Sequence, residues 1–169
     1  MAPAIEVARC QDVAFVKVTG LGNFNNAAAV REWVETEIQA GARRVVLDFS
    51  DCNGLDSTFM GTMMGFLSCP LTVNGDTQKL SDSCVALTVL NASAAALRAM
   101  TSLGLQAVMD IKSNPVTVPD VKLRLLNTGM IAPQQRIRLI REAHENLVRL
   151  DPANEKIFAP FLEALLKGS

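Results

Sequence analysis

The feature that most restricts the fold is a strand, a helix and a second strand in direct succession. Residues 13–19 are β-branched and half-alternating, which predicts a strand. Residues 27–40 place apolar side chains on one stripe, as in an amphipathic helix ended by Gly41. Residues 44–49 are a short apolar run typical of a buried strand. This order suits a right-handed parallel crossover, so the chain is predicted to fold around an α/β sheet.

The remaining elements of the N-terminal part extend this sheet. Residues 5–8 are expected to pair with residues 13–19 across a turn at Gln11-Asp12, and a helix is expected from Ser57 to about Cys69. The later elements are a strand at 84–90, a helix at 93–103 and a last strand at 107–111. Residues 71–83 form a polar connection that is longer than usual, which predicts either a surface excursion or a functional loop. We therefore expect, over residues 1–112, a mixed, mainly parallel sheet of four to five strands with helices mostly on one face.

The C-terminal part is predicted to contain helices and a linker but no strands. Residues 113–132 contain two prolines and little periodicity, as a linker would. Pro133 then opens a strong amphipathic helix that continues to about Leu150, and a second apolar stripe follows despite Pro160. We expect residues 113–169 to form a linker and C-terminal amphipathic helices. These helices either pack on their own domain or provide a partner or homodimer surface.

Composition excludes several classes of function. The chain has 16 Lys+Arg and 17 Asp+Glu, giving a net charge of −1, so electrostatics gives it no reason to bind nucleic acid or anionic lipid. The hydrophobic fraction of 49% is ample for a core. No signal peptide pattern opens the chain, and no uninterrupted apolar run approaches the ~18 residues of a membrane span. A cytoplasmic protein is expected.

Metal, cofactor and catalytic patterns are weak. Four cysteines share no short spacing and His144 is the single histidine, so no metal site is predicted. Gly20-Leu21-Gly22 follows a strand, but the third glycine of a dinucleotide fingerprint is missing and there is no Walker motif, so no cofactor is expected. His144 is interpreted as a structural or exposed residue, which leaves a serine nucleophile without a base. We therefore expect no enzyme.

The most informative stretch joins the strand at 44–49 to the helix expected from Ser57. Ser57 is expected at the N-cap or in the first turn, near free backbone N–H groups. A phosphate there would meet the positive end of the helix dipole and would invert the local surface charge. The alternative is an ordinary N-cap serine.

The segment Asp56-Ser57-Thr58-Phe59-Met60-Gly61 resembles the signature of STAS domains in bacterial anti-sigma factor antagonists. That signature is a hydrophobic strand, an acidic-polar turn and then Asp-Ser-Ser/Thr-Gly-x-Gly at the start of an apolar helix. The sequence matches at Asp, Ser, Thr and the final Gly, whereas Phe59 replaces a glycine. The resemblance extends over roughly residues 5–111.

The resemblance implies a phosphate-controlled partner switch. In that family, the first serine after the aspartate is phosphorylated by an anti-sigma factor that is a serine kinase of GHKL type, and a PP2C-type phosphatase reverses the step. The unphosphorylated form binds the partner. Carried over, Ser57 is the phosphoacceptor and Thr58 a secondary candidate. The expected partner-binding residues lie in the loop before the first helix and around the acceptor: Asn23, Phe24, Asn25, Asp56, Ser57, Thr58, Phe59 and Met60.

The sequence therefore predicts a regulatory protein-binding module of anti-sigma-antagonist type. The alternative is a STAS scaffold that assembles a signalling complex without phosphorylation.

Overall fold

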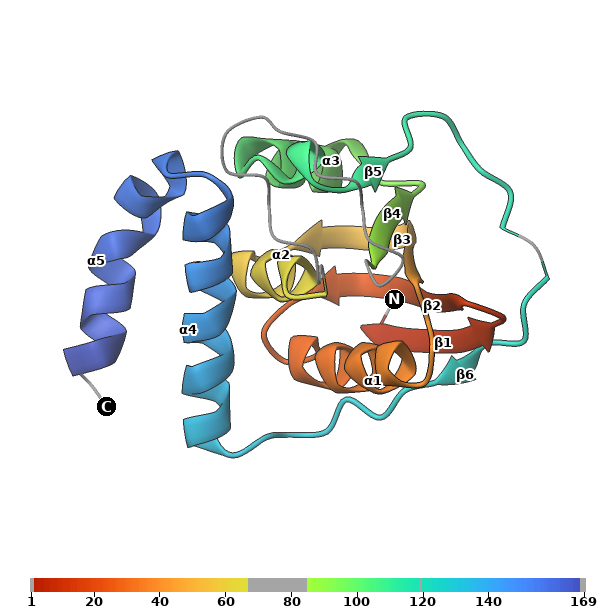
Figure 1. Ribbon diagram of the computed structural model, residues 1–169, viewed down its shortest axis with the longest axis horizontal. Helices are drawn as coiled ribbons and strands as arrows, with labels where there is room; N and C mark the ends of the chain where they lie inside the picture. Colours follow the sequence, from red (N-terminus) through yellow and green to blue (C-terminus); the bar gives the residue numbers. More distant parts are fainter. Residues whose placement is uncertain (1, 67–84, 119, 168–169) are drawn as a thin grey trace.

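The computed structural model describes residues 2–66, 85–118 and 120–167. Its elements alternate strand and helix through the N-terminal part and end with two long helices (Figure 1). In chain order they are β1 (Ala4–Cys10), β2 (Val13–Gly22), α1 (Ala27–Gln39), β3 (Arg44–Leu55), α2 (Ser57–Met64), β4 (Ala86–Leu90), α3 (Ala94–Ser102), the short 3-10 helix η1 (Leu105–Ala107), β5 (Asp110–Ile111), β6 (Arg124–Leu125), α4 (Pro133–Leu150) and α5 (Ala153–Lys167).

Within the described residues, the sheet has six strands in the order β5-β4-β3-β2-β1-β6. The pairs β2–β3, β3–β4 and β4–β5 are parallel, and β1 is antiparallel to both β2 and β6. The expected α/β class and mixed sheet are confirmed, but the sheet has six strands instead of the expected four to five. The additional strand, β6, lies in the segment interpreted as linker. It has only two residues, both exposed, so it is too short to produce a strand pattern of its own.

Alternation along the strands explains why the helices gather mostly on one face. Val16, Leu47 and Val89 lie in register on neighbouring strands and are fully buried. Val46 directly precedes Leu47, and Thr88 directly precedes Val89. Both point to the other face of the sheet and are only half-buried. The side chains of α1 and α3 join the first set in a single core.

The strand β3 is longer than the sequence indicated. The strand was predicted over residues 44–49, but it continues to Leu55 and stays paired with β2 through two register shifts. The polar residues are accommodated because parallel pairing uses backbone groups and the side chains find partners. Lys17 Nζ lies 3.0 Å from Asp51 Oδ2, and this hydrogen bond raises the pKa of Lys17. As a result, β3 carries the chain directly to the start of α2.

Helix α2 ends at Met64 rather than near Cys69. Cys69, Cys84 and the polar connection 71–83 lie outside the described residues. The helix expected over 93–103 is confirmed as α3, with the Ser93 side chain accepting from the Ala96 N–H.

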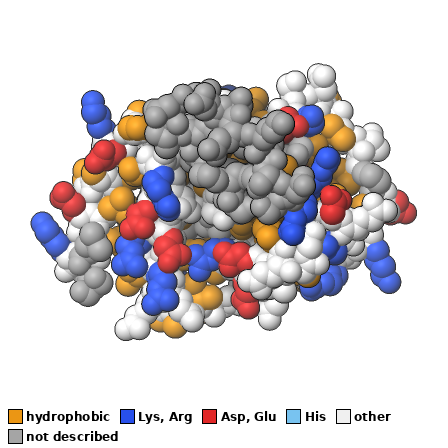
Figure 2. All heavy atoms as spheres, viewed as in Figure 1, with side chains coloured by type: hydrophobic (Ala, Val, Ile, Leu, Met, Phe, Trp, Pro, Cys, Tyr) orange, Lys and Arg blue, Asp and Glu red, His pale blue; other side chains and the backbone are white. Residues whose placement is uncertain are grey.

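The C-terminal helices, α4 and α5, pack on their own domain. Helix α4 lies across α2, and α5 runs along the outer side of α4 (Figure 1). The bounds of α4 agree with the sequence prediction, and its stripe of Leu139, Ala143 and Leu147 is buried. Acidic and basic side chains are interspersed over the visible face (Figure 2), as the net charge of −1 suggests.

Candidate functional site

Asp56 fixes the entry to α2. It is the N-cap residue, and its Oδ1 accepts a hydrogen bond of 2.7 Å from the Phe59 N–H. Its Oδ2 accepts a second bond of 2.9 Å from the Phe24 N–H. One carboxylate therefore joins the two segments in which the sequence placed the partner-binding residues.

The loop before α1 is held by its own asparagines. The buried Asn26 accepts from the Asn23 N–H and donates to the Leu21 carbonyl, each at 2.9 Å. The Asn23 side chain accepts from the Asn25 N–H. Asn26 occupies the N-cap position of α1, but its side chain forms no capping hydrogen bond and holds the loop instead. Phe24 and Asn25 are left exposed, and Asn23 is half-buried.

Ser57 is the first residue of α2, with Asp56 taking the cap. Its hydroxyl is therefore not used for capping and forms a 2.8 Å hydrogen bond with His144 Nε2 on α4. Ser57 is half-buried. The bond joins two residues 87 positions apart and connects α4 to the STAS-like motif.

The second nitrogen of His144 shows which way this bond runs. Nδ1 lies 2.7 Å from the Ile140 carbonyl oxygen, which can only accept, so Nδ1 carries a proton. In the neutral ring, Nε2 is then the acceptor and the Ser57 hydroxyl donates to it. The imidazole is 3% exposed and contacts two rings of α5, with centroids of Phe158 and Phe161 each 4.8 Å away.

A serine–histidine hydrogen bond is also the first requirement of a nucleophilic catalytic site. The residues around the Ser57–His144 pair are therefore compared with those of such a site. In a hydrolase, an acidic side chain orients the histidine, whereas here a helix carbonyl does so. The rings of Phe158 and Phe161 pack directly against the imidazole. His144 was interpreted as structural or exposed, and its burial excludes the exposed alternative. The contact with Ser57 was not predicted.

The other expected contact residues of α2 point inward. Thr58, Phe59 and Met60 are 5%, 1% and 4% exposed. Phe59, which replaces the glycine of the STAS signature, fills space next to Gly22, where an added Cβ would come within 3.1 Å of the Phe59 ring. In this conformation, the surface near the acceptor is therefore formed by Ser57 and by residues of α4.

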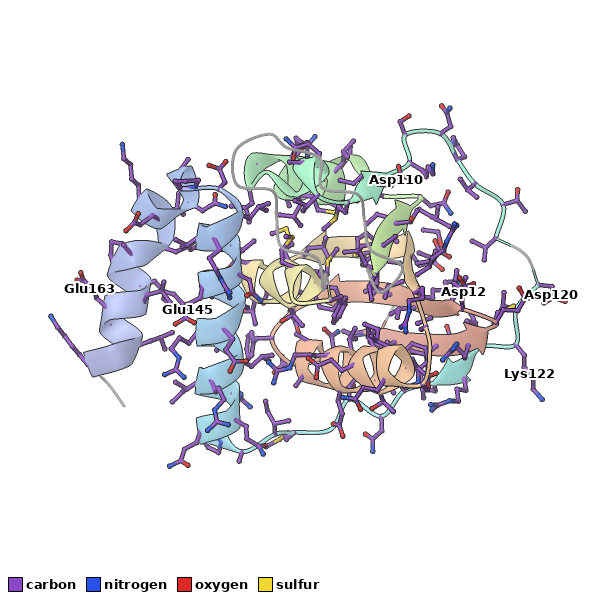
Figure 3. The ribbon with its side chains drawn as sticks, viewed as in Figure 1. Asp12, Asp110, Asp120, Lys122, Glu145 and Glu163 are labelled. Atoms are coloured by element: carbon purple, nitrogen blue, oxygen red, sulfur yellow. The ribbon has the colours of Figure 1, made fainter. Side chains whose placement is uncertain are left out.

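Gly61, the final glycine of the motif, marks the place where α4 crosses α2. A Cβ on Gly61 would overlap the Ala143 carbonyl group and lie 2.8 Å from the Ala143 Cα. The Asn146 side chain also donates to the Gly61 carbonyl at 3.1 Å. The side-chain view shows α4 reaching toward α2 on one side and toward α5 on the other (Figure 3).

Three contacts at this site were not predicted from the sequence. They are the bond of His144 to Ser57, the crossing of α4 at Gly61, and the position of the Arg136 guanidinium 5.6 Å from the Phe24 ring centroid. One signal was available. A helix that is apolar all round, as α2 is, needs cover on two sides, and α4 carries the matching apolar stripe.

Among the described residues, no group of three or more His, Cys, Asp and Glu side chains could hold a metal ion. In the same part of the chain, no helix has the length and apolar character needed to cross a membrane.

Comparison with protein families gives a match to the STAS domain over residues 4–68, which confirms the resemblance seen in the sequence. The comparison with curated proteins found no match.

Solved structures with the same fold include two related molecules. An anti-sigma factor antagonist from Mycobacterium paratuberculosis has a TM-score of 0.51 and 17% identity, over 67% of this chain and 87% of that one. A Thermotoga maritima protein described as a candidate anti-sigma factor antagonist has a TM-score of 0.50 and 18% identity, over 63% of this chain and 84% of that one. At these identities, the likeness shows the fold.

Proposed function

Starting from the STAS match over residues 4–68, we propose that the chain is a cytoplasmic regulatory module that binds an anti-sigma factor when Ser57 is unphosphorylated. Phosphorylation of Ser57 by that partner, a serine kinase of GHKL type, releases it, and a PP2C-type phosphatase restores binding. The observation that carries the proposal is the position of Ser57 as the first residue of α2, directly after the Asp56 cap and inside the matched segment.

Charge supplies the switching force. A phosphate on Ser57 brings about −1.5 to −2 charges next to the Asp56 carboxylate. The first N–H groups of α2 and the helix dipole favour the phosphate, so the fold tolerates it while the surface becomes strongly negative. An acidic or apolar partner face that docks on the neutral surface is then repelled.

The choice of acceptor follows burial. Ser57 is half-buried, whereas Thr58 is 5% exposed, so Ser57 is the acceptor and Thr58 the secondary candidate. For contact with the partner, Phe24 and Asn25 are the most accessible of the expected residues. A homodimer through the C-terminal helices has less support, because α4 uses its apolar stripe within its own chain.

The alternative is a STAS scaffold that assembles a complex without phosphorylation. The specific observation that favours it is the bond between Ser57 and His144, which engages the acceptor hydroxyl. The scaffold predicts that partner binding is unaffected by charge at position 57.

The test is mass spectrometry of the chain purified from its native cells over several growth conditions. The proposal expects a phosphorylated form that maps to Ser57 and is absent from Ser57→Ala. Absence of phosphate under all conditions contradicts the switch. A Ser57→Asp variant is expected to lose the partner in a pull-down, and retained binding favours the scaffold.

A further inference from the structure

Helix α2 is covered both by the core of the sheet and by α4. All seven residues after Ser57 in this helix are buried, and its apolar residues are not confined to one stripe. Such a helix does not stand at a free surface, because much apolar area would face water. The apolar side chains of α2 join one core with residues of the sheet and of α1. Helix α2 also makes extensive contact with α4.

The contact between α2 and α4 is built for close approach. Ser57 and Gly61 are one helical turn apart, and they face His144 and Ala143. Because Gly61 has no side chain, the two backbones meet directly, and Asn146 donates to its carbonyl. The surface along α2 therefore accepts a helix that carries a small residue at the crossing point.

Helix α4 also contacts the loop before α1 and α1 itself. Arg136 lies over the Phe24 ring, and Arg31 Nη1 forms a 2.7 Å ion pair with Glu142 Oε2. One helix of the same chain thus contacts both segments that are expected to bind a partner.

We propose that the C-terminal helices are an autoinhibitory segment: α4 occupies the surface used by an external partner and must leave α2 before that partner reaches Ser57. The inference rests on the proposed function, since it concerns access to the same site. It also specifies the competing element, an amphipathic helix with a small residue at the crossing with Gly61.

The geometry makes the two states mutually exclusive. His144 Nε2 lies 2.8 Å from the Ser57 oxygen, which leaves no room for a phosphoryl group between them. A phosphoryl donor that approaches this oxygen from the side of α4 meets the His144 ring. Docking of α4 and modification of Ser57 therefore compete.

Gly61→Ala separates the two states with a single methyl group. The added Cβ points at the α4 backbone and clashes there, while alanine suits the interior of α2 itself. Gly65→Ala is the matched control, since its Cβ would come no closer than 3.3 Å to the Asn146 side chain or the Thr62 carbonyl oxygen and would not meet the backbone of α4.

Access to position 57 is measured by placing Ser57→Cys in each background and following alkylation by iodoacetamide with peptide mass spectrometry. We expect position 57 to be labelled slowly in Ser57→Cys and in Ser57→Cys/Gly65→Ala. Labelling is expected to be about tenfold faster or more in Ser57→Cys/Gly61→Ala, the shift that overpacking at a close contact produces. Equal rates in all three, or rapid labelling in Ser57→Cys alone, overturn the inference.

Hydrogen exchange in β2 and β3 checks that the body stays folded. If Gly61→Ala unfolds the body, the Arg31–Glu142 pair gives a second route. Arg31→Glu and Glu142→Arg are each expected to speed labelling of Ser57→Cys, and the double exchange to slow it again. If the Arg31→Glu/Glu142→Arg double variant does not restore the slow labelling rate, the inference is overturned. Because no kinase is present, the result is independent of whether Ser57 is phosphorylated in cells.

Discussion

The sheet body and the C-terminal helices are attached by different kinds of contact. In the body, register-paired strands place Val16, Leu47 and Val89 in one core with α1 and α3. The C-terminal helices are joined to the body by one apolar stripe and a few side-chain bonds, including His144–Ser57 and Arg31–Glu142. Backbone pairing is cooperative, whereas individual side-chain bonds contribute little each. We therefore expect α4 to detach from the sheet body more readily than the sheet body unfolds.

The largest effect is expected from Leu47→Ala, which opens a cavity in the fully buried centre of the sheet. The free energy of unfolding should fall by about 2–5 kcal/mol. Urea denaturation measures it, with the exposed Lys122→Ala as control. Hydrogen exchange should rise in the body and in α4 together, because α4 packs on a surface that the body builds. Protection lost in α4 alone would contradict this dependence.

A smaller and local effect is expected from Asn154→Ala at the start of α5. The Asn154 side chain is 1% exposed and donates to the carbonyls of Leu103 and Leu147, at 3.0 and 2.8 Å. Leaving these buried acceptors without a donor costs about 1–3 kcal/mol. Hydrogen exchange should rise in α5 and at the end of α4, with β3 unchanged and the exposed Lys156→Ala as control. Equal loss of protection in β3 would mean that both regions form one cooperative unit.

The smallest effect is expected in the alkylation rates of Cys10 and Cys52, which both lie in the sheet and therefore report on its integrity. Burial raises the pKa of the Cys52 thiol above its ordinary value of 9.0, so at neutral pH it is protonated as well as covered. Alkylation should modify the exposed Cys10 first, and Cys52 should accelerate only as pH rises beyond 9.0. The same raised pKa means that the contribution of Cys52 to stability is complete below 9.0 and is lost as pH rises through the folded value. Asn154→Ala should leave the Cys52 rate unchanged, and a faster rate would show that loosening α5 opens the body.

The elements with strong local patterns could be predicted from the sequence. The hairpin of β1 and β2, the crossover through α1 to β3, and the bounds of α4 all follow from apolar periodicity and from Gly41 and Pro133. The position of Ser57 at the start of α2 follows from the motif, one residue past the cap.

What could not be predicted depends on contacts between distant segments. The continuation of β3 through Asp51 and Asn53 depends on pairing with β2, and β6 depends on the exposed edge of β1. The bond between Ser57 and His144 joins residues whose local sequences give no sign of each other. Gly61 was recognised as a motif position, but its role depends on the helix that crosses it.

The pairing of β6 with β1 has a consequence for competition. It anchors the chain only a few residues before Pro133, so α4 is attached to the body by a short tether. A tether of this kind holds its helix at an effective concentration on the order of millimolar. A rival protein at cellular abundance must therefore bind the bare surface far more tightly than α4 does. Any signal that lengthens the tether, such as detachment of β6, would lower that threshold without altering the docking surface.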